Sequence, residues 1–399
     1  MTDVGDGACL RVITDDELEA CERLKAEVFG LAFTAERMDD VRRVREVDRT
    51  FAVFEGARLV ATLSALTHTL TVPGGQVAAC GVTGLAVKRS RAQTGLEDRL
   101  FVAELRAAKD RGEPVAALCA LADLSVDYTR YGFGVASYGT DLILRSPWPG
   151  LACEPDVEVT TVHRDDALPA VQSVYDALRA VLPGAVDRSP GQWLRWEDRL
   201  RAYPLVVARA EGRPVGYMVA RPEPADDGDR VYLAEFLATT PAAYHALARH
   251  MLTSGEVAEI RAEHRPVHEP LLWRLPIRLR SQRTATDGIW VRLVDVAAAL
   301  SARRYQRKVS VTLAVSDDLL AENHRTFKLE SDGSDASCVP STSTPEVRVT
   351  VGALGAAYLG GVPLSALAAA GLIDATPGAL ERLDAAFASS VAPWAVTRF

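Results

Sequence analysis

Apolar positions along the first 150 residues alternate between the spacing of a helix and the spacing of a strand. A helical spacing predicts a helix over 15–28, and two apolar runs at 51–54 and 59–68 predict strands that form a hairpin. A further strand is expected at 82–87 and a second helix at 96–112. Helix, antiparallel strands, helix and strand in this order predict an α+β layered fold.

The stretch 82–112 predicts a strand, a loop and a helix. Leu96, Leu100, Ala103 and Ala107 recur at helical spacing until Gly112 supplies a stop. The first amides of a helix are unpaired and lie at the positive end of its dipole, so the loop before them is a candidate cradle for phosphate. Many strand-to-helix turns bind no ligand, and on this stretch alone both interpretations remain open.

The same order of elements recurs after a break. Prolines around 146–150 predict a boundary, and strands and helices between 157 and 252 then repeat the first pattern. The loop 239–241 of this second unit has neither glycine nor a basic residue, so no phosphate site is expected there. A further boundary falls near 293–300.

Beyond it the pattern predicts a third unit of strands and helices, with a surface loop rich in Ser, Asp and Thr over 332–344. The strands are expected at 309–315, 326–330 and 346–351, and the helices at 351–358, 364–370 and 379–388.

Length and composition narrow the class of protein. A chain of 399 residues suggests two or three domains, and 48% hydrophobic with 25% charged residues is typical of soluble proteins. A net charge of −8 argues against nucleic acid as the main partner and is compatible with cationic substrates. There is no apolar run of about 18 residues and no secretion signal, so we expect a cytoplasmic protein without a membrane partner.

The cysteines and histidines give little indication of a metal site. Six cysteines without CxxC spacing argue against a zinc knot or a disulfide scaffold and fit a reducing compartment. His264 and His268 have a spacing that can place two metal ligands on one helix face, but Pro266 between them disfavours a helix. No metal is predicted.

Several segments carry a family resemblance over nearly the whole chain. DGIWVRLVDVAAAL at 287–300, VYLAEFLATTPAAYHALARHML at 231–252 and the terminal APWAVTRF resemble the Eis (enhanced intracellular survival) acetyltransferases. The resemblance implies an α+β protein with two tandem GNAT-like domains followed by a sterol-carrier-protein-like domain. It places an N-terminal GNAT domain at 1–148, a second GNAT-like domain at 149–295, and at 296–399 a third domain that supports the C-terminus.

The resemblance also implies an acetyl-CoA-dependent N-acetyltransferase without a metal. Its acceptor would be an amine of a cationic small molecule such as an aminoglycoside, with lysine side chains as a lesser possibility, and the chain would form a homo-oligomer, a hexamer. The residues expected to bind acetyl-CoA are Leu85, Ala86 and Val87 on the strand, Arg89, Arg91, Gln93, Thr94, Gly95, Leu96, Glu97 and Asp98 in and after the loop, and Asp123 and Leu124 after the next strand.

Two catalytic groups follow from the resemblance. A Tyr-x-Arg-aromatic-Gly-aromatic-Gly motif begins at Tyr128, which would be the general acid, with Tyr131 and Tyr138 as substitutes. The base would be the terminal carboxylate of Phe399. Both roles suit the chemistry, because a carboxylate can take the proton of an ammonium group and a phenol can protonate a leaving thiolate.

The loop departs from the family pattern. Residues 92–97 read Ala-Gln-Thr-Gly-Leu-Glu and contain no basic side chain, while Lys88, Arg89 and Arg91 lie just before them. One possibility is that Arg89 or Arg91 contacts the phosphates and the chain is an enzyme. The alternative is a non-catalytic scaffold or binding protein that has kept the shell of the fold but not its cofactor loop.

Overall fold

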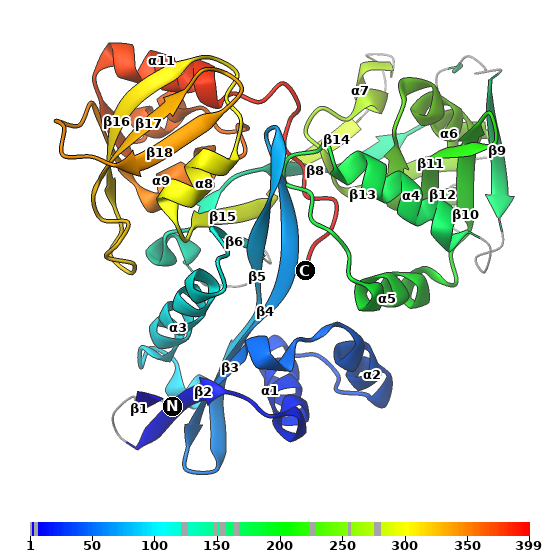
Figure 1. The fold of residues 1–399 in the computed structure, drawn as a ribbon. Coiled ribbons are helices and arrows are strands. Elements are labelled where there is room, and N and C mark those ends of the chain that lie inside the picture. Colours follow the sequence, from blue (N-terminus) through cyan, green and yellow to red (C-terminus); the bar gives the residue numbers. More distant parts are fainter. Residues whose placement is uncertain are drawn as a thin grey trace.

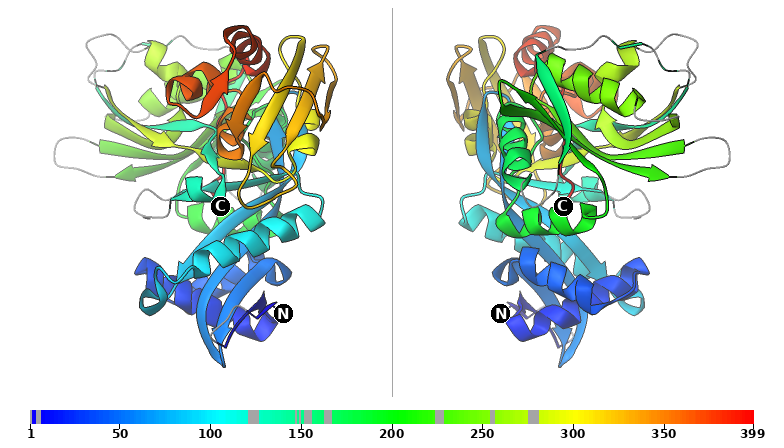
Figure 2. Two further views of the ribbon diagram at one scale, coloured as in Figure 1. Left: turned by 90° about the vertical axis from the view of Figure 1, so that its left-hand side faces the viewer. Right: turned by 90° about the vertical axis from the view of Figure 1, so that its right-hand side faces the viewer.

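The structure, a computed structural model, describes residues 2–3, 7–120, 127–146, 148, 150–151, 156–162, 167–223, 229–253, 257–274 and 281–399. Asp123 and Leu124, both expected to bind acetyl-CoA, lie outside these described residues. Figures 1 and 2 show three lobes, each built on its own β-sheet. In the described part, none of the helices combines the length and apolar character needed to cross a membrane.

The first lobe contains an eight-stranded sheet in the order β1-β2-β3-β4-β5-β6-β15-β7. The hairpin of β3 and β4 and the helix before it were predicted, whereas α2, a short amphipathic helix, was not. The strands are β1 (Thr2–Asp3), β2 (Ala8–Val12), β3 (Thr50–Glu55), β4 (Arg58–Val72), β5 (Gly75–Val87), β6 (Val115–Cys119), β7 (Gly134–Val135) and β15 (Ile289–Leu293). The helices are α1 (Leu18–Phe29), α2 (Ala35–Val44) and α3 (Leu96–Asp110), with 3₁₀ turns η1 (Asp15–Glu17), η2 (Val47–Arg49), η3 (Arg89–Arg91) and η4 (Tyr128–Tyr131).

The second lobe contains a seven-stranded sheet in the order β14-β8-β13-β12-β11-β10-β9. Its apolar core lies between this sheet and its helices, α4, α5 and α6 among them. The strands are β8 (Tyr138–Arg145), β9 (Val157–Val162), β10 (Leu205–Ala210), β11 (Arg213–Glu223), β12 (Asp229–Ala238), β13 (Val257–Pro266) and β14 (Ser281–Asp287). The helices are α4 (Leu168–Arg179), α5 (Pro190–Leu200), α6 (Pro241–Thr253) and α7 (Pro270–Arg274).

The third lobe contains a five-stranded sheet in the order β18-β17-β16-β19-β20. The predicted loop over 332–344 is wrong in its middle, because β18 pairs there with β17 from Ala336 opposite Ser331 to Pro340 opposite Phe327. The strands are β16 (Val309–Ser316), β17 (Thr326–Ser331), β18 (Ala336–Pro340), β19 (Val347–Thr350) and β20 (Ile373–Ala375). The helices are α8 (Val296–Ala302), α9 (Val351–Ala357), α10 (Leu364–Ala369) and α11 (Pro377–Phe387).

A two-stranded ribbon joins the first two sheets. The chain leaves the first sheet after β7 and enters the second as β8, and it returns from β14 to β15 at Gly288. The two crossings touch, because a Cβ on Gly288 would lie 2.3 Å from Oγ of Ser137. The expected domain boundary at 148 stays a prediction. The division between the two sheets lies elsewhere, because β8, which precedes residue 148, belongs to the second sheet and β15 belongs to the first.

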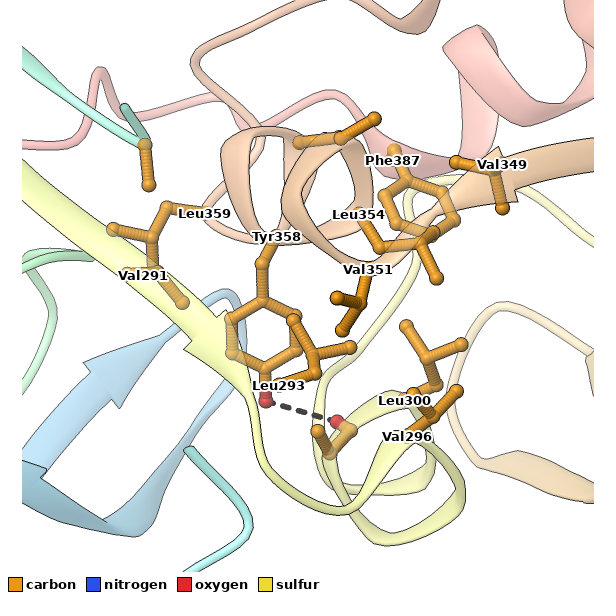
Figure 3. Close-up of a cluster of buried hydrophobic side chains, with 14 of the residues drawn as sticks. Val291, Leu293, Val296, Leu300, Val349, Val351, Leu354, Tyr358, Leu359 and Phe387 are labelled. Atoms are coloured by element: carbon orange, nitrogen blue, oxygen red, sulfur yellow. Dashed lines mark hydrogen bonds between the residues drawn. The ribbon is translucent and has the colours of Figure 1, made fainter. Parts of the chain in front are cut away.

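The third lobe packs on the first through α9. Figure 3 shows Val291 and Leu293 of β15 together with Leu354 and Tyr358, and the hydroxyl of Tyr358 donates to the carbonyl oxygen of Ala299 at 2.8 Å. This shared core fixes the lobe from which the last residues of the chain extend.

Candidate active site

The site begins where β5 and β6 separate. The two parallel strands pair only from Ala79 opposite Val115 to Gly81 opposite Ala117, although β5 continues to Val87. Along 82–87 the β5 edge that faces β6 therefore lies open, while the other edge still pairs with β4. A bulge with Gly84 at φ +63° marks this segment. An open strand edge of this kind can hydrogen-bond an extended amide chain.

The loop after β5 turns sharply into α3. Gly95, at φ +76°, is the residue before the first turn of the helix, and Gln93 also has a positive φ of 62°. The side chain of Thr94 donates to the carbonyl oxygen of Arg91 at 2.6 Å. The amides at the start of α3 therefore follow a compact turn, as an anion cradle requires.

The charged residues expected in this loop differ in their contacts. Arg89 and Glu97 line a cavity of about 710 Å³ beside β5. Arg91 forms an ion pair with Glu55, with an Nε to Oε1 distance of 2.6 Å. The carboxylate of Asp98 accepts a hydrogen bond from the hydroxyl of Tyr131 at 2.9 Å. The side chain of Asp98 is thus committed to the tyrosine motif.

Some of the apolar residues expected at the cofactor site line the cavity, and others do not. Leu85 and Val87 line the cavity, whereas Ala86 is buried on the other face of the strand and Leu96 lies in the core. Because successive side chains of a strand point to opposite faces, the side chain of Ala86 points away from the cavity, and only its backbone is available to the cofactor.

Tyr128 lines the same cavity from the opposite side. It sits at the start of η4, where the side chain of Asp127 accepts from the amide of Thr129 at 3.0 Å. Its ring packs edge-on against Phe101 and Trp290, at centroid distances of 6.2 and 6.0 Å. Burial, and then the charge of Glu97, raise the pKa of Tyr128, so the phenol stays protonated near neutral pH.

The two substitute tyrosines are placed differently. Tyr131 stacks on Phe101 at 3.9 Å and donates its hydroxyl proton to Asp98. Tyr138 is exposed and does not line the cavity, although it borders another cavity near the third lobe. Of the three, Tyr128 alone lines the cavity beside β5.

The C-terminal tail, residues 388–399, passes between the second and third lobes and ends at this cavity (Figure 1). The amide of Trp394 donates to Pro183 and its indole donates to His264. Tyr175 donates its single hydroxyl proton to Val186, so the hydroxyl of Thr397, 2.6 Å away, must donate to Tyr175.

Phe399 is held at the meeting point of two cavities. Its ring lies against His68, with centroids 4.6 Å apart, and a Cβ on Gly81 would approach the ring to 3.0 Å. Nδ1 of His68 lies 3.2 Å from Oδ1 of Asp187, which fixes the imidazole. Phe399 lines both the cavity beside β5 and a second one of about 530 Å³ between the first two lobes.

Sequence reasoning missed several residues that line these cavities. Lys25 is fully buried, pairs with Glu22 at 2.6 Å and lies against Gly84 of the bulge. Burial, and then repulsion from Arg45, lower the pKa of Lys25 to about 8. In the sequence it stands among charged residues of the predicted helix 15–28, and its residue type gives no indication of burial.

Cys119 at the end of β6 is a second such residue. Its thiol faces the end of the tail, and burial raises its pKa to about 11. A thiol that stays protonated at neutral pH is a poor nucleophile. The raised pKa therefore gives Cys119 little thiolate character near neutral pH.

Over the ranges that the structure describes, His, Cys, Asp and Glu side chains form no group of three or more that could hold a metal ion. His264 lies in β13 at φ +50°, so the pair with His268 is not on one helix face.

Two adjoining domains of this fold, with an open strand edge leading to a helix N-terminus, define a GNAT N-acetyltransferase. Residues 10–136 and 184–293 each match the acetyltransferase (GNAT) domain family, and residues 296–396 match the sterol carrier protein domain family. GNAT domains use acetyl-CoA as the acetyl donor. The observed fold is thus two GNAT domains followed by a sterol-carrier-protein-like domain.

The chain belongs to the Eis family of N-acetyltransferases. It is 31% identical to N-acetyltransferase Eis of Mycobacterium tuberculosis over 341 residues, which cover 81% of each chain. An uncharacterized N-acetyltransferase of Streptomyces avermitilis is 33% identical, over 96% of this chain and 98% of the relative. The crystal structure of Eis1 from Mycobacterium abscessus superposes with a TM-score of 0.84 at 26% identity, over 98% of this chain and all of that one.

Proposed function

We propose that this acetyltransferase transfers the acetyl group directly from acetyl-CoA to an amine, with Tyr128 as general acid and the terminal carboxylate of Phe399 as base. The observation that supports these roles is that both residues line one cavity, together with Leu85 and Val87 of the open β5 edge. The strand, Tyr128 and the chain terminus line this cavity from three distant parts of the sequence, which supports the proposed roles.

The described residues fit acetyl-CoA as the donor. The open edge of β5 over 82–87 suits the amide groups of its pantetheine arm, and the turn at Gln93–Gly95 with the start of α3 suits its pyrophosphate. Arg89 lines the cavity close by, and a charge-assisted hydrogen bond from it would contribute about 1.5 to 3 kcal/mol. When bound, acetyl-CoA supplies an activated acyl group.

The terminal carboxylate and the tyrosine hydroxyl of the protein then transfer the protons. The carboxylate of Phe399 accepts a proton of the ammonium group, directly or through water. The neutral amine then forms a C–N bond as the C–S bond breaks, and its nitrogen releases the remaining excess proton to solvent. Amides of β5 near Leu85 stabilise the charge that develops on the carbonyl oxygen. The hydroxyl of Tyr128 protonates the departing thiolate, and a high phenol pKa makes this transfer depend on position more than on driving force.

Release of CoA thiol from acetyl-CoA in the presence of amines tests this function. We expect calorimetric binding of acetyl-CoA and thiol release that requires an amine. Adding one alanine after Phe399 displaces the carboxylate by about 3.8 Å and should abolish turnover while acetyl-CoA binding stays. A protein that binds no acetyl-CoA and releases no thiol with any amine would refute the proposal, and an unchanged rate in the extended variant would refute the base.

The remaining parts of the proposal concern acceptor, assembly and compartment. The resemblance suggests an aminoglycoside, a hexamer and a cytoplasmic enzyme. Free cysteines, such as Cys21 and Cys80, fit a reducing compartment. Sedimentation analysis checks the hexamer, and an aminoglycoside belongs in the amine panel of the thiol assay.

A further inference from the structure

Four arginines from two lobes gather on the acceptor side of the site, and we name them the arginine cluster. Two of them belong to α2: Arg37 lies within this helix and Arg45 follows its last residue. The other two, Arg195 and Arg199, lie in α5. All four line the cavity beside β5, and three of them also line the cavity between the first two lobes. The second cavity ends, like the first, at Phe399.

Packing between α2 and α5 fixes this arrangement. A Cβ on Gly191 would lie 1.8 Å from the carbonyl oxygen of Arg43, so the two helices touch at a position where only glycine fits. Arg43 also forms an ion pair with Asp198 across the contact. The cluster is therefore assembled by the docking of the two lobes.

The cluster is short of negative partners. Among the described residues, no carboxylate lies within ion-pairing distance of Arg37, Arg195 or Arg199, and Arg45 shares Glu22 with Lys25. The Nε atoms of Arg37 and Arg195 are buried without a hydrogen-bond partner in this part of the chain. A cationic donor that is buried without a partner is costly, and four neighbouring positive charges generate a potential that attracts anions.

The electrostatics of Arg195 agree with this arrangement. Burial, followed by repulsion from Arg199 and Arg45, lowers its pKa to about 10, and a smaller attraction from Asp40 opposes this shift. An anion placed among these side chains would satisfy the free donors and remove the repulsion.

Location separates the cluster from the expected phosphate cradle. The loop Gln93–Gly95 leads into α3, and Figure 1 shows α3 and α5 on opposite sides of the C-terminus. The cavity between the first two lobes is lined by three members of the cluster, Arg45, Arg195 and Arg199, but by no residue of that loop. Because the pyrophosphate of acetyl-CoA is expected at that loop, we assign an anion bound in the cavity between the lobes to the acceptor.

We propose that the amine acceptor of this enzyme carries an oxyanion, a carboxylate or a phosphate, which the arginine cluster binds while the amine faces Phe399. This inference rests on the proposed function, since it takes the carboxylate of Phe399 as the base. An acceptor with several positive charges, such as an aminoglycoside, would instead bring cations against the arginines, so the anionic acceptor replaces the aminoglycoside that the resemblance suggests.

Binding is tested with matched ligands on the full-length protein loaded with CoA, which cannot react. Calorimetry compares aminopentanoate with aminopentanamide, which differ in the carboxylate and keep a similar amine, and phosphoethanolamine with ethanolamine. We expect each anionic ligand to bind about ten- to a hundredfold more tightly than its neutral match, as expected for one or two charge-assisted hydrogen bonds. The ligand pair with the larger difference in affinity shows whether the cluster prefers a carboxylate or a phosphate.

Substitutions test whether the arginine cluster causes the preference for anionic ligands. Arg195→Gln and Arg199→Gln should each remove most of the preference for the anionic ligand, and the double variant should remove it entirely. Arg201→Gln is the matched control, because Arg201 follows α5, is exposed and pairs with Asp198. Thermal unfolding checks that all the variants fold.

The outcomes separate the two proposals. Equal or weaker binding of the anionic member of both pairs, no binding by any of the four ligands, or a preference that survives the double variant would overturn the inference. Preferential acetylation of an aminoglycoside would also overturn it and would leave the acetyltransferase mechanism standing. If the proposed mechanism is wrong and the inference is right, the protein binds the anionic ligands selectively but releases no thiol from acetyl-CoA.

Discussion

Tyr128 and Tyr131 lie three residues apart, and the fold gives them different tasks. The ring of Tyr128 lines the cavity that ends at Phe399, whereas the hydroxyl of Tyr131 donates to Asp98 at the start of α3. The sequence motif finds both tyrosines but cannot separate them by residue type. What separates them is the direction of each side chain from one 3₁₀ turn, and this depends on packing against Phe101 and Trp290.

Substitution of the two tyrosines tests this difference. Tyr128→Phe should lower kcat by about a hundred- to ten-thousandfold, the range of general acid catalysis, with acetyl-CoA affinity nearly unchanged. Tyr131→Phe is the control; it should keep kcat and cost about 0.5 to 1.5 kcal/mol of stability through the lost hydrogen bond. Steady-state kinetics and thermal unfolding measure both. Equal losses of kcat would mean that the acid has been assigned to the wrong side chain.

The pKa of Tyr128 predicts the alkaline limb of the rate profile. Burial disfavours the phenolate and raises this pKa above the usual value of 10, so the neutral acid persists until the pH exceeds that value. We therefore expect kcat to show no decline from loss of this proton below about pH 10. A pH profile of kcat checks this, and a decline in wild type that is centred below pH 9 and absent in Tyr128→Phe would contradict it.

At the scale of elements, the sequence predicts best where the hydrophobic period is strong. The β3–β4 hairpin, α3 and the helices α9, α10 and α11 of the third lobe follow from local spacing, whereas α8 was not predicted. β18 was missed because it lies inside a segment, 332–344, whose Ser, Asp and Thr content is typical of a loop. Its pairing with β17 supplies the backbone partners that the local pattern does not reveal. Likewise Gly191 has no local signal, because the neighbour that requires it lies on α2.

The contact of α9 with β15 provides a test at this scale. A Cβ on Gly355 would lie 2.1 Å from the carbonyl oxygen of Val291, so Gly355→Ala should cost about 1 to 3 kcal/mol although alanine favours helices. Gly378→Ala in α11 is the control, because the nearest atom is 3.6 Å away and belongs to a flexible arginine. Thermal unfolding midpoints compare them. If Gly355→Ala were as stable as the control, the close approach would not support the docking of the third lobe.

At the scale of the molecule, the site depends on parts that no single lobe contains. The first lobe supplies β5 and Tyr128, the second supplies α5, and the tail comes from the third. The sequence predicts the acid and the terminus through family resemblance. It does not predict the arginine cluster, since arginines some 150 residues apart meet only when α2 and α5 dock.

A truncated chain tests this dependence. A fragment of residues 1–148 keeps the expected N-terminal domain but lacks β15, whose strand from Ile289 to Leu293 pairs with β6. It also leaves β8 without β13 and β14. We expect no cooperative thermal unfolding and no calorimetric binding of acetyl-CoA. A folded fragment that binds acetyl-CoA as tightly as the whole chain would show that the first sheet is complete without β15.

The ribbon that crosses at Ser137 and Gly288 also constrains how such a protein can change over generations. Domains that are separate along a gene can be shuffled, duplicated or lost one at a time. Here a recombination event that exchanged only the first 148 codons would deliver a sheet whose strand β15 is still encoded by the old gene, 140 codons downstream. The two acetyltransferase domains are therefore expected to be inherited as one unit, and hybrid genes should be viable only when both crossings come from the same parent.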